Sequence, residues 1–385
     1  MKKIYIIFFF LLIDLFLSQF FLLKILENDL LRANRESFEN RIFNKNYNYT
    51  FKKLVKFTSQ YDNNIYNIST NDLGFRDSDT QPIDRNKNFS IVIGDSFIEG
   101  VGLEYDDTIV GILNKKLEND DLKFLNAGVA SYSSYIYLQK IKTIIKNNDD
   151  LKIKDVIVFL DKSDVSDDEN YLEKPLLFED TKGKFIHQRK DDFLKDIKDF
   201  SFWRFYTKQT VSGKIIKLSA DQIENFASNI KKRFLVSKKL SKGFFEVSSL
   251  ELKAIKSINN KPHIRNWYLG ELWEKKTKKN IEFSIENLSN LKNFLERRDI
   301  RLVVVLYPWS FEIDDSSIGK KYLEFIIPLL RKNNIKTLSV YDEFFKGNIY
   351  ENIGKYYLYN DIHFNKNGNK IIANNLIQKI NQWKN

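Results

Sequence analysis

The chain has 385 residues, 43% hydrophobic and 29% charged, which is the composition of a globular protein and not of a disordered one. It has no cysteine, which excludes disulfide bonds, thiolate catalysis and cysteine metal sites. The net charge of +11 would suit nucleic acid, but no zinc-ligand set, RNP motif or helix-turn-helix signature accompanies it. We therefore expect no nucleic-acid partner, and anionic lipid or acidic polysaccharide is the better explanation of the charge.

The first segment, residues 1–24, is predicted to be a signal anchor. Lys2 and Lys3 precede a run of about twenty mostly apolar residues, long enough for a helix to cross the hydrocarbon core of a membrane. No small-residue cleavage site follows, so we favour an uncleaved anchor over a cleaved signal peptide or a buried helix. The two lysines predict a cytoplasmic N-terminus, with the rest of the chain on the outer side of the membrane.

Residues 25–85 are polar and charged with scattered aromatics, and we expect a stalk and N-terminal extension that leads into a domain over residues 86–385. The extension contains the run Asn71-Asp72-Leu73-Gly74-Phe75-Arg76. A turn at Gly74 would aim Arg76 back toward the domain, where its guanidinium could bind a substrate carboxylate in bidentate fashion. The alternative is that Arg76 braces a loop.

Five short apolar runs without clear alternation are typical of strands buried on both faces. They are Ser90–Ile93, Lys123–Leu125, Asp155–Leu160, Arg301–Leu306 and Thr337–Val340, and helical spacing is found at Thr108–Glu118, Ser134–Asn147, Ile281–Arg297 and Asn365–Trp383. Alternating strands and helices imply a parallel sheet with right-handed crossovers. We therefore predict a three-layer α/β/α sandwich with a five-stranded parallel sheet in flavodoxin-like order.

The segment from about residue 166 to residue 280 breaks this alternation and is rich in lysine and aromatic residues, with Lys231-Lys232-Arg233 and Lys238-Lys239 close together. It is predicted to be a largely helical insertion that caps the domain. Its basic surface either binds membrane lipid or an anionic glycan, or is simply solvated. His187 and His263 lie here and are expected to be surface or structural residues.

A Gly-Asp-Ser tripeptide, residues 94–96, follows the first predicted strand and places a serine where that strand ends. Far downstream, Asp361 and His363 lie one residue apart, and the chain has only three histidines. A nucleophile, a base and an acid that orients the base are the parts of a serine hydrolase. We predict Ser96 as the nucleophile, His363 as the base and Asp361 as the acid, with Asp95 bracing the loop. The alternative for Ser96 is a simple helix cap.

These pieces, in this order, resemble the SGNH (GDSL-type) hydrolase superfamily. The match consists of Gly94-Asp95-Ser96 after a strand, Leu125-Asn126-Ala127-Gly128, a strand ending at Asp164 and the late Asp-x-His, over roughly residues 70–165 and 300–380. The resemblance implies an esterase that works through an acyl-enzyme and needs no cofactor.

The spacing of the acid narrows the resemblance. In most of the family the acid stands three residues before the histidine, where this chain has Asn360, whereas its carboxylate stands two before. This closer spacing resembles a subgroup that includes proteins acetylating exopolysaccharides. The run Asn71–Arg76 looks like an element found ahead of Gly-Asp-Ser in some membrane-anchored members.

The resemblance places the oxyanion hole at Ser96, Ser131 and Ser163, with two departures from the family. Ser131 stands roughly where the family has glycine, although its main-chain N–H is still present. Ser163 stands where the family has asparagine, and a missing side-chain donor costs about 3 kcal/mol of transition-state stabilisation. Either Ser163 donates instead, another group does, or the enzyme is slow.

Four further residues are predicted to bind substrate: Arg76, Asp164, Tyr307 and Trp309. Asp164 is expected to shape its loop or contact the substrate. Tyr307 and Trp309 follow a strand, where aromatic rings stack on sugar faces or, alternatively, pack in the core. No metal is predicted, because the sequence has no His-x-x-x-His and no carboxylate loop with metal-ligand spacing.

The leading prediction is an extracytoplasmic, membrane-anchored serine ester hydrolase that removes acetyl groups from a cell-envelope glycan. The first alternative is an O-acetyltransferase that uses the same triad to modify a polysaccharide. The second is a non-catalytic binding or assembly protein on a degenerate scaffold of this type. The expected partners are an acylated glycan or another small ester and the membrane; the sequence leaves the oligomeric state open.

Overall fold

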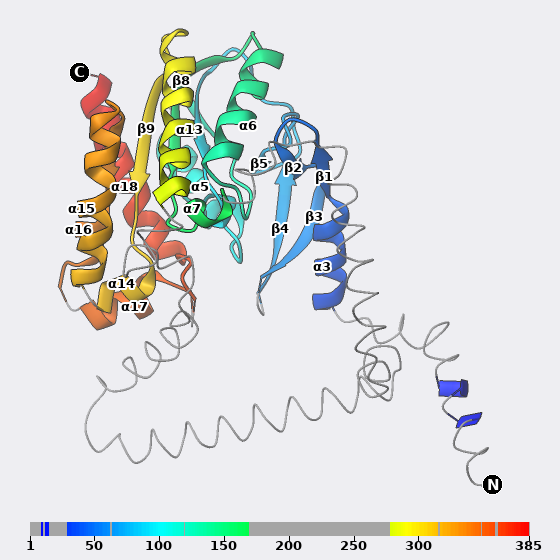
Figure 1. Ribbon diagram of the computed structural model, residues 1–385. Helices are drawn as coiled ribbons and strands as arrows, with labels where there is room; N and C mark the ends of the chain where they lie inside the picture. Colours follow the sequence, from blue (N-terminus) through cyan, green and yellow to red (C-terminus); the bar gives the residue numbers. More distant parts are fainter. Residues whose placement is uncertain are drawn as a thin grey trace, which may run out of the picture. The chain divides into compact units, whose positions relative to one another are not determined.

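The computed structural model describes residues 9–10, 12–14, 29–61, 64–118, 120–168, 278–314, 316–347, 349–358 and 361–384 (Figure 1). The chain divides into two units, residues 1–32 with 179–247 and residues 33–178 with 248–385. In the first unit, the described residues are helical. Helix α3 (Asp29–Glu39) begins there, and everything else described below belongs to the second unit.

The second unit is built on one sheet of eight strands, in the order β10-β9-β8-β6-β7-β5-β4-β3. These are β3 (Lys56–Tyr61), β4 (Asn64–Thr70), β5 (Arg76–Asp77), β6 (Asn88–Ile93), β7 (Leu122–Asn126), β8 (Lys152–Phe159), β9 (Arg301–Leu306) and β10 (Lys336–Ser339). The five strands from β10 to β7 are parallel and are the five that the sequence predicts, in flavodoxin-like order. The predicted total of five strands was wrong, because β5, β4 and β3 continue the sheet antiparallel beyond β7.

The three additional strands lack the continuous apolar runs of buried parallel strands. In β6, residues 89–93 are all buried, whereas β4 mixes exposed with buried residues and β5 is only two residues long. Antiparallel strands with one solvated face give a weaker apolar signal than parallel strands covered on both faces. They arise from residues 25–85, which also form the hairpin of β1 (Arg41–Asn44) and β2 (Asn48–Phe51).

Helices cover both faces of the sheet, which gives the predicted three layers (Figure 1). One face packs against α6 (Ser134–Asn147), α13 (Lys278–Glu296) and α15 (Ser316–Lys332), and the other against α5 (Ile109–Lys116) and α18 (Lys366–Lys384). Strand side chains alternate between the two cores, so that Ile91 and Ile93 enter the first and Val92 enters the second. The four predicted helices are therefore all present, with bounds that differ by three residues or fewer.

Short helices connect these elements around the sheet. They are α4 (Ser96–Glu99), the 3-10 turn η2 (Tyr105–Asp107), α7 (Asp164–Asp167), α14 (Ser310–Asp314), α16 (Tyr341–Phe344) and α17 (Ile349–Tyr356).

Two predictions fall largely outside the described residues. The helical insertion at about 166–280 is described only up to residue 168 and from residue 278 onward, and His187 and His263 lie outside the described ranges. Of the apolar N-terminal run, only residues 9–10 and 12–14 are described. Among the described residues, no helix is long and apolar enough to span a bilayer, and most of the predicted anchor lies outside these residues.

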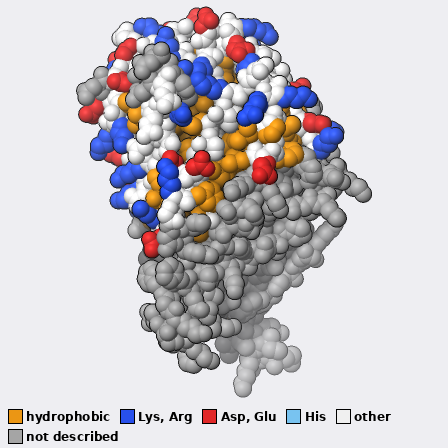
Figure 2. Space-filling model, turned by 90° about the vertical axis from the view of Figure 1, so that its left-hand side faces the viewer, with side chains coloured by type: hydrophobic (Ala, Val, Ile, Leu, Met, Phe, Trp, Pro, Cys, Tyr) orange, Lys and Arg blue, Asp and Glu red, His pale blue; other side chains and the backbone are white. Residues whose placement is uncertain are grey.

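The charge on the face shown in Figure 2 is mixed. Lys and Arg side chains lie among Asp and Glu side chains and exposed hydrophobic ones, and over the coloured part of this face they form no single basic patch. On this part of the surface, the excess positive charge is therefore not gathered into a basic surface of the kind that binds a polyanion.

The parallel strands bring several loops to one edge of the sheet. Ser96 follows β6, Ser131 lies in the loop after β7, Ser163 follows β8 and Trp309 follows β9. Because the carboxyl ends of parallel strands meet at the same edge, these residues face a common site.

Candidate active site

The Gly-Asp-Ser turn folds the way it does because each of its residues meets a specific local demand. A Cβ on Gly94 would lie 2.6 Å from Cγ1 of Ile98, so a side chain there would collide with α4. Asp95 is the N-cap of α4, and its Oδ1 accepts the main-chain N–H of Phe97 at 3.0 Å, which confirms the predicted bracing role. Ser96 is left as the partly exposed residue at the start of the helix, facing the pocket.

Asp95 is itself unusual, because it is buried beside other carboxylates. Burial and the charge of Asp161 raise the pKa of Asp95 well above its ordinary value. Ionisation of the Asp95 carboxyl, next to Ser96, is therefore disfavoured.

Asp361, His363 and Ser96 form one continuous chain of hydrogen bonds. Nε2 of His363 lies 2.7 Å from Oγ of Ser96, and its Nδ1 lies 2.5 Å from Oδ1 of Asp361. The same Oδ1 accepts the main-chain N–H of His363 at 2.8 Å, so the close two-residue spacing closes a tight turn onto the histidine. The imidazole also packs on Phe97, with ring centroids 4.6 Å apart.

The direction of each proton in this chain follows from the charge of Asp361. Burial alone would raise the pKa of Asp361, but hydrogen bonds from His363, the charge of His363 and the Tyr61 hydroxyl together hold it below its ordinary value. An ionised carboxylate accepts but cannot donate, so Nδ1 of His363 carries the proton between them. Nε2 is then the acceptor, and the Ser96 hydroxyl donates to it, as a general base requires.

The loop after β7 is held next to Ser96 by Glu99. Oε2 of Glu99 accepts the main-chain N–H of Ala130 at 2.7 Å, and the neighbouring Ser131 adopts a φ of +62°. A positive φ strains a residue that has a Cβ, so a glycine at this position would adopt the same backbone conformation without that strain. Among the described residues, no hydrogen bond uses the main-chain N–H of Ser96 or Ser131, and both residues line the pocket. These two N–H groups are therefore available to an oxyanion.

Ser163, predicted to belong to the oxyanion hole, lines the pocket, but its hydroxyl is engaged elsewhere. Oγ of Ser163 donates to Oδ1 of Asp161 at 2.7 Å, and its main-chain N–H donates to the same oxygen at 2.7 Å. A hydroxyl has one proton, so in this arrangement Ser163 has no side-chain donor left for an oxyanion.

The four residues predicted to bind substrate are all buried, and only Trp309 of the four lines the pocket. Arg76 is 1% exposed, and its guanidinium donates to the carbonyls of Glu99 at 2.6 Å and Gly100 at 2.8 Å, which is the bracing alternative. Asp164 is fully buried and accepts from the Tyr137 hydroxyl at 3.0 Å. Neither residue lines the pocket.

The two aromatic candidates share one carboxylate. The Tyr307 hydroxyl and the Trp309 indole N–H both donate to Oδ2 of Asp161, each at 2.8 Å. Both rings are 1% exposed, which corresponds to the core alternative, although Trp309 does contribute to the pocket wall.

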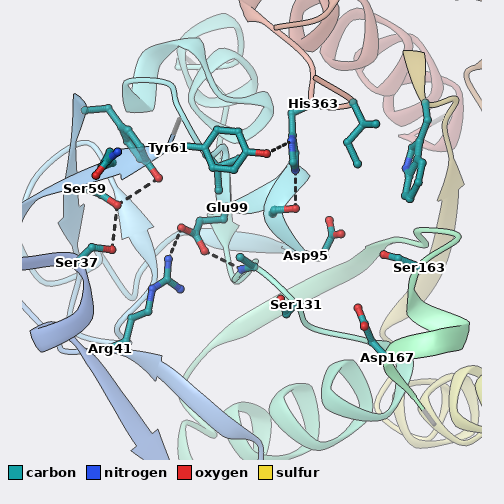
Figure 3. Close-up of a pocket in the computed structure, with 17 residues that line it drawn as sticks. Ser37, Arg41, Ser59, Tyr61, Asp95, Glu99, Ser131, Ser163, Asp167 and His363 are labelled. Atoms are coloured by element: carbon teal, nitrogen blue, oxygen red, sulfur yellow. Dashed lines mark hydrogen bonds and ion pairs between the residues drawn. The ribbon is translucent and has the colours of Figure 1, made fainter. Parts of the chain in front are cut away.

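The pocket has a second wall that the sequence did not predict (Figure 3). The cavity measures about 390 Å³ and is lined on this side by residues of the N-terminal extension: Ser37 from α3, Arg41 from β1, Ser59, Gln60 and Tyr61 from β3, and Tyr66 from β4. Arg41 pairs with the buried Glu99 at 2.6 Å. No motif marks these residues, because they are isolated polar side chains on one helix and three short strands, and the site they join is formed by residues far away in the sequence.

The described residues offer no built metal site: no group of three or more His, Asp or Glu side chains among them is arranged to hold a metal ion. The chemistry proposed below uses the side chains and main-chain N–H groups of the pocket alone.

Comparisons with known proteins give matches among solved structures only. No family model and no curated protein matches the chain. The esterase EstA of Pseudoalteromonas sp. matches with a TM-score of 0.38 and 10% identity, over 77% of this chain and 98% of that one. A GDSL-like lipase of Bacteroides thetaiotaomicron matches with 0.35 and 12%, over 78% and 91%. A lipolytic G-D-S-L protein of Veillonella parvula matches with 0.34 and 13%, over 76% and 97%. At such low values, the function of this chain has to be inferred from its own site.

Proposed function

We propose that this protein is a serine ester hydrolase in which Ser96 is the nucleophile, His363 the general base and Asp361 the acid that orients it. The observation that carries the proposal is the unbroken chain from Asp361 through His363 to Ser96, with contacts of 2.5 and 2.7 Å, opening into a cavity. A non-catalytic scaffold would have no need for this alignment, which therefore favours an enzyme over the binding-protein alternative.

In the first half-reaction, Oγ of Ser96 attacks the ester carbonyl carbon while its proton passes to Nε2 of His363. The carbonyl oxygen becomes an oxyanion, which accepts hydrogen bonds from the main-chain N–H groups of Ser96 and Ser131. The tetrahedral intermediate then collapses: the bond to the alcohol oxygen breaks, and this oxygen takes the proton from Nε2. The alcohol leaves, and the acyl group stays on Ser96.

In the second half-reaction, a water molecule attacks the acyl carbon and gives its proton to Nε2 of His363. Collapse of this second intermediate breaks the bond to Oγ of Ser96, which recovers its proton from the histidine. The carboxylic acid is released and the enzyme is restored. If a sugar hydroxyl takes the place of the water, the same steps transfer the acyl group instead of hydrolysing it.

The pocket favours a small acyl group on a polar alcohol. Its wall from the N-terminal extension carries hydroxyl, amide and guanidinium groups, and the opposite wall carries Ser131, Ser163 and Asp167. A cavity of about 390 Å³ lined in this way suits a short acyl ester of a hydroxyl-rich molecule more than a long lipid chain. We propose acetyl esters of a cell-envelope glycan as the substrate class.

The proposed location rests on the N-terminal sequence. The apolar run behind Lys2 and Lys3 would tether the enzyme to a membrane, with the catalytic unit outside the cytoplasm. This setting agrees with a glycan ester as substrate, because such polymers lie outside the cell membrane.

The test is hydrolysis of p-nitrophenyl acetate and of an acetylated polysaccharide by the full-length protein, beside Ser96→Ala and His363→Ala. Ser339→Ala, a serine on β10 whose side chain is exposed, is the matched control. We expect both triad variants to lose activity and the control to keep it. Equal rates in all four proteins would refute the hydrolase. Acetylated acceptor formed in place of free acetate, when a second glycan is added, would assign the transferase.

A further inference from the structure

We propose that Tyr61 is a positioning residue that completes the catalytic assembly by locking Asp361 and His363 to each other. The proposal rests on the proposed function, because it assigns Tyr61 a role in the same reaction. Tyr61 comes from β3, in the N-terminal extension, and none of the motifs that identify the triad includes it.

The Tyr61 hydroxyl contacts both members of the pair at once. Its Oη lies 2.9 Å from Oδ2 of Asp361 and 2.9 Å from Nδ1 of His363. The two rings meet edge to face, with centroids 5.0 Å apart and an interplanar angle of 80°. Figure 3 shows the Tyr61 hydroxyl pointing at the imidazole from the side opposite the pocket wall that carries Ser163.

The proton positions allow only one arrangement of this triangle. Nδ1 of His363 already carries a proton toward the carboxylate, so the phenol proton of Tyr61 must be donated to Oδ2 of Asp361. The lone pairs of Oη then face the Nδ1 proton. In the opposite tautomer, Nδ1 would accept and Nε2 would donate to Ser96, and His363 could not act as a base. The Tyr61 hydroxyl thus favours the one tautomer that the reaction needs.

The carboxylate of Asp361 needs a second partner, because His363 binds only one of its two oxygens. Its Oδ1 is used twice by His363, through the main-chain N–H and through Nδ1. Oδ2 remains, and the Asp361 side chain is 20% exposed, so solvent could compete for that oxygen. Among the described residues, Tyr61 is the only side chain other than His363 that hydrogen-bonds to this carboxylate.

Tyr61 is placed by regular structure and not by a loose loop. It ends β3, where it pairs with Asn64 of the antiparallel partner strand β4. Its ring lies against Gly102, where an added Cβ would come within 3.5 Å of Cδ1 of the ring. The extension is therefore part of the catalytic site, and its hairpin delivers a group to the triad.

The experiment compares Tyr61→Phe with Tyr105→Phe in the full-length protein. Tyr105 is a matched control, because it is a buried tyrosine whose hydroxyl bonds to Asn114 and lines no part of the pocket. We expect Tyr61→Phe to lower kcat about tenfold and to leave KM within about twofold, because the lost hydrogen bond orients the base and does not bind substrate. Tyr105→Phe should change neither constant by more than about twofold.

A second readout does not depend on activity. The exchangeable Nδ1 proton of His363 gives a far-downfield proton resonance, which His363→Ala identifies by its disappearance. We expect Tyr61→Phe to shift or broaden this resonance and Tyr105→Phe to leave it in place. An unchanged resonance with kcat within twofold of the wild type, or the same loss of kcat in Tyr105→Phe, would overturn the proposal. If the wild type shows no esterase activity at all, the proposed function fails, and the resonance alone decides whether Tyr61 fixes His363.

Discussion

The carboxylate of Glu99 binds Ala130 and Arg41 at the same time. Its Oε2 accepts the main-chain N–H of Ala130 at 2.7 Å, and its Oε1 forms an ion pair with Arg41 at 2.6 Å. The Glu99 side chain is fully buried and lies one helical turn after the nucleophile. A single carboxylate thus ties together α4, the loop that carries Ser131 and the N-terminal extension. The position of one oxyanion donor therefore depends on an ion pair made by a residue that precedes the sheet.

Glu99→Gln should weaken both stability and catalysis. The amide keeps one oxygen, so it can serve Ala130 or Arg41 but not both, and a guanidinium loses its countercharge. We expect unfolding free energy to fall by about 2 kcal/mol and kcat by about tenfold or more. Denaturant titration and steady-state kinetics measure the two effects. Glu343→Gln, in a more exposed pair with Lys346, is the control and should cost less than about 0.5 kcal/mol. A Glu99→Gln protein with wild-type kcat would contradict the role given to this carboxylate.

Ser131→Gly should stabilise the protein and leave its catalytic rate nearly unchanged. A serine at a φ of +62° is strained, and glycine relieves this strain at some cost in chain entropy, so we expect a net gain of about 0.5–1 kcal/mol. The main-chain N–H is kept, so kcat should stay within about twofold. Asn334→Gly is the control for the backbone effect. Asn334 also has a positive φ, +53°, and it does not line the pocket. A loss of stability in Ser131→Gly, measured by denaturant unfolding, would show that the Ser131 side chain has a role of its own.

The parallel core could be predicted from the sequence because burial on both faces leaves a visible trace. Runs such as Arg301–Leu306 are apolar at nearly every position, and the Gly-Asp-Ser turn combines a steric need, a cap and a nucleophile in three residues. Antiparallel strands such as Asn64–Thr70 mix exposed asparagines with buried residues and carry no such trace.

The second wall of the site could not be predicted for a different reason. Tyr61 acts through Asp361, which lies 300 residues further along the chain, and no local pattern reports a contact at that distance. For Tyr307 and Trp309, which follow β9, the sequence pattern suggested a binding role that their burial does not match. Tyr307 and Trp309 look like a sugar platform in sequence, but both are drawn into the core by the buried carboxylate of Asp161.

Ser163→Ala should have only a small effect on the chemical step. The Ser163 hydroxyl already donates to Asp161, so its removal costs a local hydrogen bond and not an oxyanion donor. We expect kcat to fall by less than about tenfold, compared with about a hundredfold or more for loss of a dedicated donor. Steady-state kinetics on p-nitrophenyl acetate measure this difference. A loss of several hundredfold would mean that the hydroxyl turns toward the oxyanion during the reaction.

Lys140 should make stability depend on pH. It is fully buried, donates to the Ala127 carbonyl at 2.9 Å and faces the rings of Tyr47, Phe75 and Tyr132. Burial lowers the pKa of Lys140 from 10.5 to about 7. Between these values the unfolded chain holds the proton and the folded chain does not, so stability rises with pH in this window.

The measurement for Lys140 is the unfolding free energy of the wild type relative to Lys140→Met, from pH 6.5 to pH 10. We expect the difference to grow in favour of the wild type above about pH 7, by up to about 1.4 kcal/mol per pH unit. Curves that run parallel across the range would show that Lys140 keeps its proton on folding.

The most direct test of the central claim is to label the nucleophile. A p-nitrophenyl alkylphosphonate reacts with an activated serine by forming an Oγ–phosphorus bond and expelling p-nitrophenolate, and peptide mass spectrometry locates the adduct. We predict a single adduct on Ser96 in the wild type, none in Ser96→Ala, and labelling slowed about a hundredfold or more in His363→Ala. An adduct on another residue, or equal labelling rates with and without His363, would contradict the proposed mechanism.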